Sequence, residues 1–167
     1  MIERKVARRL GELFMDKGCI SAAQLETALK EQRTSKEFIG AILVRKGWVT
    51  EEELLKTLGE QYGIPYVRLA AEQIDWSVAG QFSPALTDRA CFPMRMDETS
   101  VTVAITNPLD AWVLSELGRW VGRRKLQLVL ASEQEIRAAI RRSRQQAISQ
   151  SLETLLGEEE DDTKSRP

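Results

Sequence analysis

Two copies of a 24-residue unit, at residues 9–32 and 38–61, limit the folds open to this chain more than any other feature of its sequence. The copies align without gaps, and a five-residue spacer separates them. Identical residues stand at Gly11 and Gly40, Lys17 and Lys46, Gly18 and Gly47, Leu25 and Leu54, Leu29 and Leu58, Glu31 and Glu60, and Gln32 and Gln61. Two copies are too few for a repeat array. The pattern therefore indicates a duplicated helical half-domain.

Each copy is predicted to form two short helices. The first helices are expected over residues 9–17 and 38–46, and each is followed by a shared glycine that can end a helix in the left-handed conformation. The second helices are expected to start at Ser21 and Thr50, because a glutamine or glutamate three residues later completes a capping box. The acidic residues after Thr50 suit the positive end of a helix and need no metal or acid–base role.

The second helix of each copy carries an apolar stripe that ends in an amide. In the first copy the spacing of four and three residues places Leu25, Leu29 and Gln32 on one side of the helix. The same spacing recurs in the second copy at Leu54, Leu58 and Gln61. One interpretation is a core-facing stripe with a solvated glutamine at its end. The repetition of the amide at one register leaves a second interpretation open, in which the amides bind a ligand.

Gly11 and Gly40 lie near the start of a helix, where glycine costs about 1 kcal/mol relative to alanine. Their presence predicts a close approach to the backbone, either by a neighbouring helix or by a phosphate. Arg9 stands two residues before the first glycine. Its guanidinium suits a phosphate, or the O6 and N7 atoms of guanine.

The rest of the chain mixes strands and helices. We expect a strand over 62–69, a helix over 75–90 that restarts at Pro84, a hairpin over 91–106, a helix over 107–122 capped by Asn107 or Asp110, a strand over 125–131 and a long basic helix over 132–156. This order predicts an α+β fold. It divides the chain into a helical repeat over 1–62, an α+β subdomain over 63–150 and an acidic flexible tail over 151–167.

Several functional classes find no support in the sequence. It has no histidine, which is the commonest general base and metal ligand, and no GxxxxGK[ST] phosphate loop. The two cysteines are far apart and indicate neither a disulfide framework nor a zinc site. No apolar run has the length of a spanning helix. We therefore expect a cytoplasmic protein that is not an enzyme and holds no metal or cofactor. The net charge of -1 and the basic stretch over 119–144 leave weak nucleic-acid binding as a remote alternative.

The tandem units closely resemble the MshEN domain, the N-terminal module of type II secretion and type IV pilus assembly ATPases. The likeness rests on the spacing of both units and on residues that include Arg9, Leu10, Gly11, Gly18 and Ile20. In that family the two motifs bind cyclic di-GMP, a two-fold second messenger, by apolar contacts and by polar contacts to guanine and phosphate. The resemblance implies a ligand site at Arg9, Leu10, Gly11, Leu25, Leu29, Gln32, Ile39, Gly40, Leu54, Leu58 and Gln61, with Asp110 as a further contact.

The sequence departs from this pattern at the start of the second unit, where Phe38 stands in the position of Arg9. If an arginine is needed at both ends, the ligand binds less tightly. The family also implies partners, either the ATPase domains or an inner-membrane platform protein of the secretion or pilus machinery. The alternative function is therefore a docking module that binds such a membrane protein without nucleotide.

Overall fold

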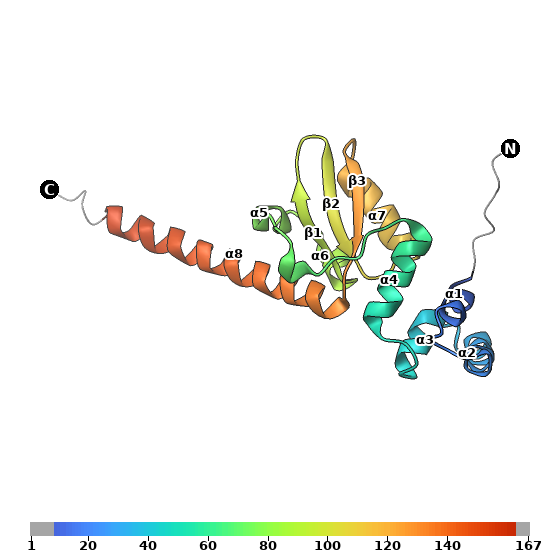
Figure 1. The fold of residues 1–167 in the computed structure, drawn as a ribbon. Helices are drawn as coiled ribbons and strands as arrows, with labels where there is room; N and C mark the ends of the chain where they lie inside the picture. Colours follow the sequence, from blue (N-terminus) through green and yellow to red (C-terminus); the bar gives the residue numbers. More distant parts are fainter. Residues whose placement is uncertain (1–8, 163–167) are drawn as a thin grey trace.

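The computed structural model describes residues 9–162 and confirms the α+β class (Figure 1). The elements, in chain order, are α1 (Leu10–Asp16), α2 (Ala22–Ser35), α3 (Ile39–Arg45), α4 (Glu51–Tyr62), the 3-10 helix η1 (Leu69–Ala71), α5 (Trp76–Ala79), α6 (Pro84–Asp88), β1 (Cys91–Met96), β2 (Ser100–Ile105), α7 (Ala111–Val121), β3 (Lys125–Leu130) and α8 (Glu133–Asp162).

The tandem repeat forms four helices, and their ends lie where the sequence predicts them. Ser21 and Thr50 accept hydrogen bonds from the backbone N–H groups three residues later, and both capping boxes are complete. Gly18 and Gly47 have φ angles of 71° and 69°, the left-handed conformation that ends α1 and α3. Arg9 is the N-cap residue of α1, and its backbone N–H donates to the Glu12 carboxylate at 3.1 Å.

The sheet has three strands in the order β1-β2-β3. The hairpin predicted over 91–106 forms the antiparallel pair β1–β2, with a bulge between Pro93 and Arg95. β3 pairs with β2 in parallel, and α7 is the connection between these two strands. The helix predicted over 75–90 is divided into α5 and α6, and α6 begins at Pro84 as expected.

The two faces of the sheet belong to two cores. Val101, Val103 and Ile105 of β2 pack in one core with α7 and with buried residues of all four repeat helices. Phe92 of β1 and Ala104 of β2 face the other way, into a smaller core that α8 covers. The repeat therefore shares a continuous apolar core with the sheet, and this contact fixes the position of its helices relative to the loops that follow β2.

The expected strand over 62–69 is wrong. α4 continues to Tyr62, and the chain then runs extended beside β3 with a single bridge between Tyr66 and Leu130. Two backbone hydrogen bonds of 2.8 Å, from Val67 to Leu130 and from Leu130 to Pro65, hold the bridge. Pro65 has no N–H to donate, so the segment cannot extend its pairing into a ladder.

The long helix α8 extends further than predicted. It continues to Asp162, so residues 151–162, for which a flexible tail was expected, are helical. Leucine and glutamate, which are good helix formers, dominate this stretch and sustain the helix. Residues 163–167 of the predicted tail lie outside the described residues. Within residues 9–162, none of the helices has the length and apolar character that crossing a membrane requires.

Candidate functional site

Reciprocal ion pairs join the two units of the repeat. Lys17 of the first unit contacts Glu60 of the second at 2.7 Å, and Lys46 of the second contacts Glu31 of the first at 2.7 Å. The lysines occupy one position of the aligned repeat, and the glutamates occupy another. The exchange of equivalent partners relates the two units by an approximate two-fold axis. These ion pairs give a structural reason for two of the identities between the repeat units, the lysine at 17 and 46 and the glutamate at 31 and 60.

The shared glycines near the helix starts make room for leucines. A Cβ atom at Gly11 would collide with Cδ1 of Leu25, and one at Gly40 would lie 2.5 Å from Cδ1 of Leu54. Each leucine belongs to the second helix of the same unit. Of the two explanations open from sequence, the structure shows close packing by a neighbouring helix, since Leu25 and Leu54 lie directly on the glycine backbones.

A groove of about 400 Å³ lies between the two units. Its size falls in the range of about 300–1,000 Å³ that small-molecule pockets occupy. Its lining residues come from α1, α2, the start of α3, the end of α4 and the loop before α7, and they are Arg9, Leu10, Gly11, Glu12, Leu25, Leu29, Gln32, Phe38, Ile39, Leu58, Gln61, Tyr62 and Leu109.

The groove brings together most of the residues singled out from sequence. Four pairs of equivalent repeat positions line it from both units, namely Arg9 with Phe38, Leu10 with Ile39, Leu29 with Leu58, and Gln32 with Gln61. Equivalent residues are not equally exposed, because the exposed fraction is 40% for Leu29 and 2% for Leu58. The two halves of the groove are thus lined by equivalent repeat positions, but the side chains at these positions are exposed to different extents.

Three predicted residues do not line the groove. Gly40 and Leu54 pack against each other in the second unit. Asp110 caps α7, where its carboxylate accepts the N–H of Val113 at 3.0 Å, and it forms an ion pair with Arg89 at 3.1 Å. The lining residue from this loop is instead Leu109, which is 42% exposed.

The sequence reasoning did not assign Glu12, Phe38, Tyr62 or Leu109 to the groove. For Phe38 a signal was present, because it stands at the repeat position of Arg9. Tyr62 directly follows Gln61 at the end of α4. Leu109 has no counterpart in the repeat, and its place depends on the packing of the sheet against the helices, which the sequence does not show.

Arg9 and Gln32 provide polar groups at the rim. Within residues 9–162, no carboxylate forms an ion pair with the exposed guanidinium of Arg9. The side-chain N–H of Gln32 donates to the backbone oxygen of Glu37 at 3.0 Å, which orients the amide. Oε1 of Gln61 is buried. The rim therefore offers one cation and one oriented amide above an apolar floor.

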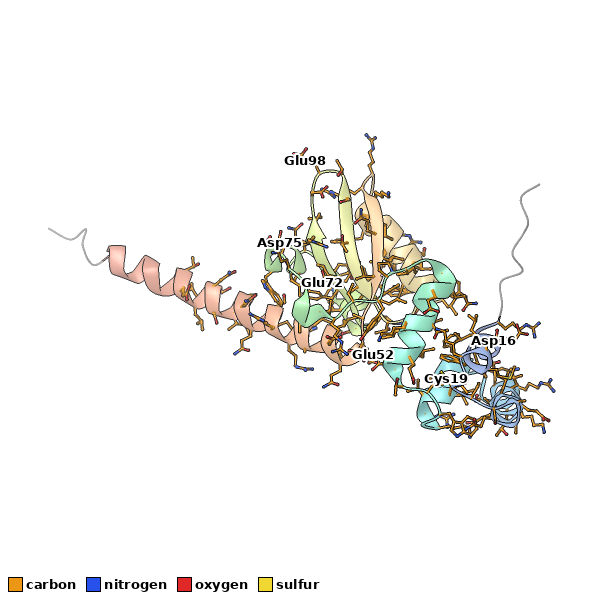
Figure 2. The ribbon with its side chains drawn as sticks, in the orientation of Figure 1. Asp16, Cys19, Glu52, Glu72, Asp75 and Glu98 are labelled. Carbon is orange, nitrogen blue, oxygen red and sulfur yellow. The ribbon has the colours of Figure 1, made fainter. Side chains whose placement is uncertain are left out.

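The described residues contain no group of three or more acidic or cysteine side chains placed to hold a metal ion. Figure 2 shows that the labelled carboxylates do not gather at one place. They are spread from the repeat to the tip of the hairpin and are Asp16, Glu52, Glu72, Asp75 and Glu98. Burial, together with the nearby charge of Asp110, raises the pKa of the Cys91 thiol to about 12. Cys91 is therefore a buried apolar residue and not a nucleophile.

Comparison with known proteins adds evidence from a different part of the chain. The family model of the MshEN domain matches residues 62–150, which follow the tandem repeat. The type IV pilus assembly ATPase PilB of Myxococcus xanthus (strain DK1622) is 30% identical over 155 residues, which are 92% of this chain and 27% of that protein. Bacteriophage adsorption protein B of Escherichia coli (strain K12) is 27% identical over 80% of this chain and 18% of that protein. The chain thus spans about a quarter or less of the length of these relatives.

Two solved structures share the fold. The structure of MshE with cdg has a TM-score of 0.74 and 24% identity, and the match covers 81% of this chain and 99% of that one. The N-terminal domain of XpsE has a TM-score of 0.61 and 20% identity, covering 85% of this chain and 98% of that one.

Proposed function

This chain belongs to the MshEN domain family, and from that premise we propose that it is a non-enzymatic regulatory module that binds cyclic di-GMP in the groove between its two repeat units. The observation that carries the proposal is the groove itself, since equivalent positions of both units converge on one site of about 400 Å³. A ligand with two-fold symmetry matches a site whose halves are related by an approximate two-fold axis. The similar structure of MshE contains cdg, an abbreviation for cyclic di-GMP.

The apolar floor is proposed to cover the faces of the bases. Leu29 presents most of this apolar surface, because it is 40% exposed, whereas Leu25 and Leu58 are buried in the floor behind it. Phe38 contributes an aromatic ring where the first unit has Arg9. Guanine has a flat apolar face, which aromatic and aliphatic side chains both contact favourably.

The polar rim is proposed to select the ligand. The Arg9 guanidinium pairs with a phosphate or with the O6 and N7 edge of guanine. The Gln32 Nε2 donates to the backbone oxygen of Glu37, and we propose that its Oε1 accepts from a guanine N–H. Because the second unit lacks an arginine at position 38, we expect unequal contributions from the two halves, with the first unit providing most of the polar contacts.

The similar proteins indicate the kind of larger protein in which such a module occurs. The similar proteins are several times longer and include assembly ATPases of type IV pili. We propose that the chain reports ligand binding to ATPase domains, or to a platform protein at the inner membrane, and that it acts in the cytoplasm. Leu109 lines the groove and belongs to the loop between β2 and α7. We propose that a ligand bound in the groove contacts Leu109 and thereby affects the loop that joins the sheet to α7.

Thermal unfolding with added nucleotides tests the proposal. Cyclic di-GMP at 100 times its dissociation constant raises stability by about 2.7 kcal/mol if it binds only the folded state, whereas GTP and cyclic di-AMP are expected to cause smaller shifts. Arg9→Ala and Gln32→Ala are each expected to lower affinity at least about tenfold, the loss of roughly 1.4 kcal/mol of charge-assisted or amide hydrogen bonding. Arg33→Ala is the matched control, since this neighbouring arginine is exposed and does not line the groove.

A folded protein whose melting temperature does not respond to cyclic di-GMP would overturn the proposal. A response that survives both groove substitutions would place the ligand elsewhere. If cyclic di-GMP causes no shift, the alternative function is docking to a membrane protein. That alternative would be supported if the unmodified chain and both variants capture an inner-membrane secretion or pilus protein equally well.

A further inference from the structure

The two repeat units differ at the residue that caps the first helix of each unit. Arg9, the N-cap residue of α1, is exposed and lines the groove. Phe38, the N-cap residue of α3, stands at the equivalent position and lines the groove as well. A guanidinium donates to the O6 and N7 acceptors of guanine, whereas adenine presents an amino donor in place of O6. An arginine can therefore distinguish guanine from adenine, and a phenylalanine in its place cannot.

The ring of Phe38 packs against the backbone of its own unit. A Cβ atom at Gly40 would lie 2.7 Å from Cε1 of Phe38, so the glycine makes room for the ring. The side chain is half-buried and packs against the apolar core. At Gly11, the three atoms nearest to the same point all belong to Leu25. The second unit thus offers a packed aromatic ring, which suits any base because every base has a flat π-face.

Two further equivalent positions differ in the same direction. Glu12 lines the groove, and its carboxylate accepts the backbone N–H of Arg9 at 3.1 Å. Its equivalent in the second unit is Ala41, which has no polar side-chain group. Tyr62 of the second unit lines the groove, whereas its equivalent Arg33 does not. Among the described residues, charged side chains therefore line the groove from the first unit alone, and aromatic rings line it from the second unit alone.

The two glutamines can pair with either purine. Gln32 uses one side-chain N–H on the backbone oxygen of Glu37, which leaves one N–H and the Oε1 atom for a ligand. A donor beside an acceptor matches N7 and the N6 amino group of adenine, and equally O6 and N1–H of guanine. Oε1 of Gln61 is buried, so this amide can offer a ligand its N–H groups, and N7 accepts from them in both purines. The amides thus hold a purine without selecting guanine.

We propose that the groove requires guanine at one base position and accepts guanine or adenine at the other. A mixed cyclic dinucleotide, cyclic GMP–AMP with the same phosphate linkages as cyclic di-GMP, is then a second ligand. This inference rests on the proposed function, because it assumes that a cyclic dinucleotide occupies the groove. Arg9 reads the edge of the guanine and does not bind a phosphate, and the ring of Phe38 covers the other base. Cyclic di-AMP has no guanine for Arg9 and binds weakly.

Calorimetric titration of the unmodified chain with the three cyclic dinucleotides tests the inference. The mixed ligand loses one of the two equivalent orientations of cyclic di-GMP, so its dissociation constant is expected to lie within about threefold of that of cyclic di-GMP. Cyclic di-AMP is expected to bind at least about tenfold more weakly than both, because it cannot satisfy Arg9. The inference would be overturned by a mixed ligand that binds as weakly as cyclic di-AMP, or by cyclic di-AMP that binds as tightly as the other two.

Substitutions at the two N-cap positions test the cause of the selectivity. Phe38→Arg places a second guanidinium in the groove and is expected to raise the preference for cyclic di-GMP over the mixed ligand at least about tenfold. Phe38→Leu is the matched control, since it keeps an apolar side chain, and it is expected to leave this preference unchanged. An unchanged preference in folded Phe38→Arg would contradict the inference.

The reverse substitution covers the case in which Phe38→Arg does not fold, because Arg9 is exposed. Arg9→Phe is expected to remove the selection of guanine, so that all three ligands bind within about threefold of one another. Retained selection of guanine in this variant would also overturn the inference. Circular dichroism melting checks that each variant is folded.

The titrations separate the failure of this inference from the failure of the proposed function. Tight binding of cyclic di-GMP with weak binding of the mixed ligand would leave the proposed function intact and overturn the inference alone. A folded chain that binds none of the three cyclic dinucleotides would overturn both.

Discussion

At the scale of single residues, the contact between Gly11 and Leu25 forms part of the groove wall. A Cβ atom at position 11 would collide with the leucine, which also lines the groove. Gly11→Ala gains about 1 kcal/mol of helix propensity but costs about 1–3 kcal/mol of overpacking. We expect a net loss of stability of about 1 kcal/mol, together with weaker ligand binding because Leu25 must move.

A second glycine provides the control for this substitution. Gly118 lies in α7 with nothing within 4 Å of the place where a Cβ would stand. Gly118→Ala is expected to stabilise the protein by about 0.5–1 kcal/mol, since only the backbone entropy changes. Urea unfolding of both variants compares them directly. Equal stabilisation by the two alanines would contradict the close packing at Gly11.

The two cysteines are expected to differ in reactivity. Burial raises the pKa of Cys91 to about 12, and Cys19 is partly exposed. Since the thiolate is the reactive form, iodoacetamide at pH 8 should modify Cys19 and leave Cys91 intact until the protein is denatured. Mass spectrometry of the labelled native protein measures this, with Cys19→Ser to assign the site. Rapid labelling of Cys91 in the native protein would show that it is accessible.

At the scale of elements, the ion pairs between the repeat units predict a pH dependence. Hydrogen bonds from Lys46 and Arg45 lower the pKa of Glu31. A carboxyl group whose pKa is lower in the folded state contributes stability above its unfolded value of about 4.3, and the contribution disappears as pH falls through the folded pKa. Glu31→Gln should therefore destabilise the protein at pH 7 and make little difference near pH 3.

Urea unfolding of both proteins at the two pH values checks the sign. Glu26→Gln is a suitable control, because Glu26 pairs with Lys30 on the same exposed helix and not across the two units among the described residues. An effect of Glu31→Gln that is the same at both pH values would show that the cross-unit ion pairs do not stabilise the repeat.

The elements themselves were largely predictable from the sequence, for local reasons. Caps at Ser21 and Thr50, and left-handed glycines after α1 and α3, are determined by residues within one turn. The segment over 62–69 was not predictable in this way, because its conformation depends on how α4 lies against β3. The helical end of α8 was not predicted from the sequence, because its acidic residues suggested a flexible tail.

The residues of the candidate site likewise fall into those that the repeat pattern predicted and those that depend on tertiary packing. The repeat pattern predicted the leucines and amides of the groove, since equivalent positions reveal a shared surface. It could not predict Leu109, which the sheet brings to the repeat through a common core. Gly40 and Leu54 follow the repeat pattern but lie beside the groove, so sequence symmetry overstates the symmetry of the site.

At the scale of the whole molecule, the repeat and the sheet share one apolar core. Buried residues of the repeat helices therefore pack in one continuous cluster with β2 and α7. The groove between the repeat units is proposed to bind a small ligand with two-fold symmetry. Ligand binding is therefore expected to stabilise the molecule as a unit, without melting of one part alone.

Calorimetric titration of the folded chain with cyclic di-GMP tests the central claim most directly. The account predicts saturable binding of one ligand per chain, because both repeat units contribute to a single groove, and a large loss of affinity in Arg9→Ala and Gln32→Ala but not in Arg33→Ala. The absence of measurable heat at several temperatures, with protein that unfolds cooperatively, would contradict it.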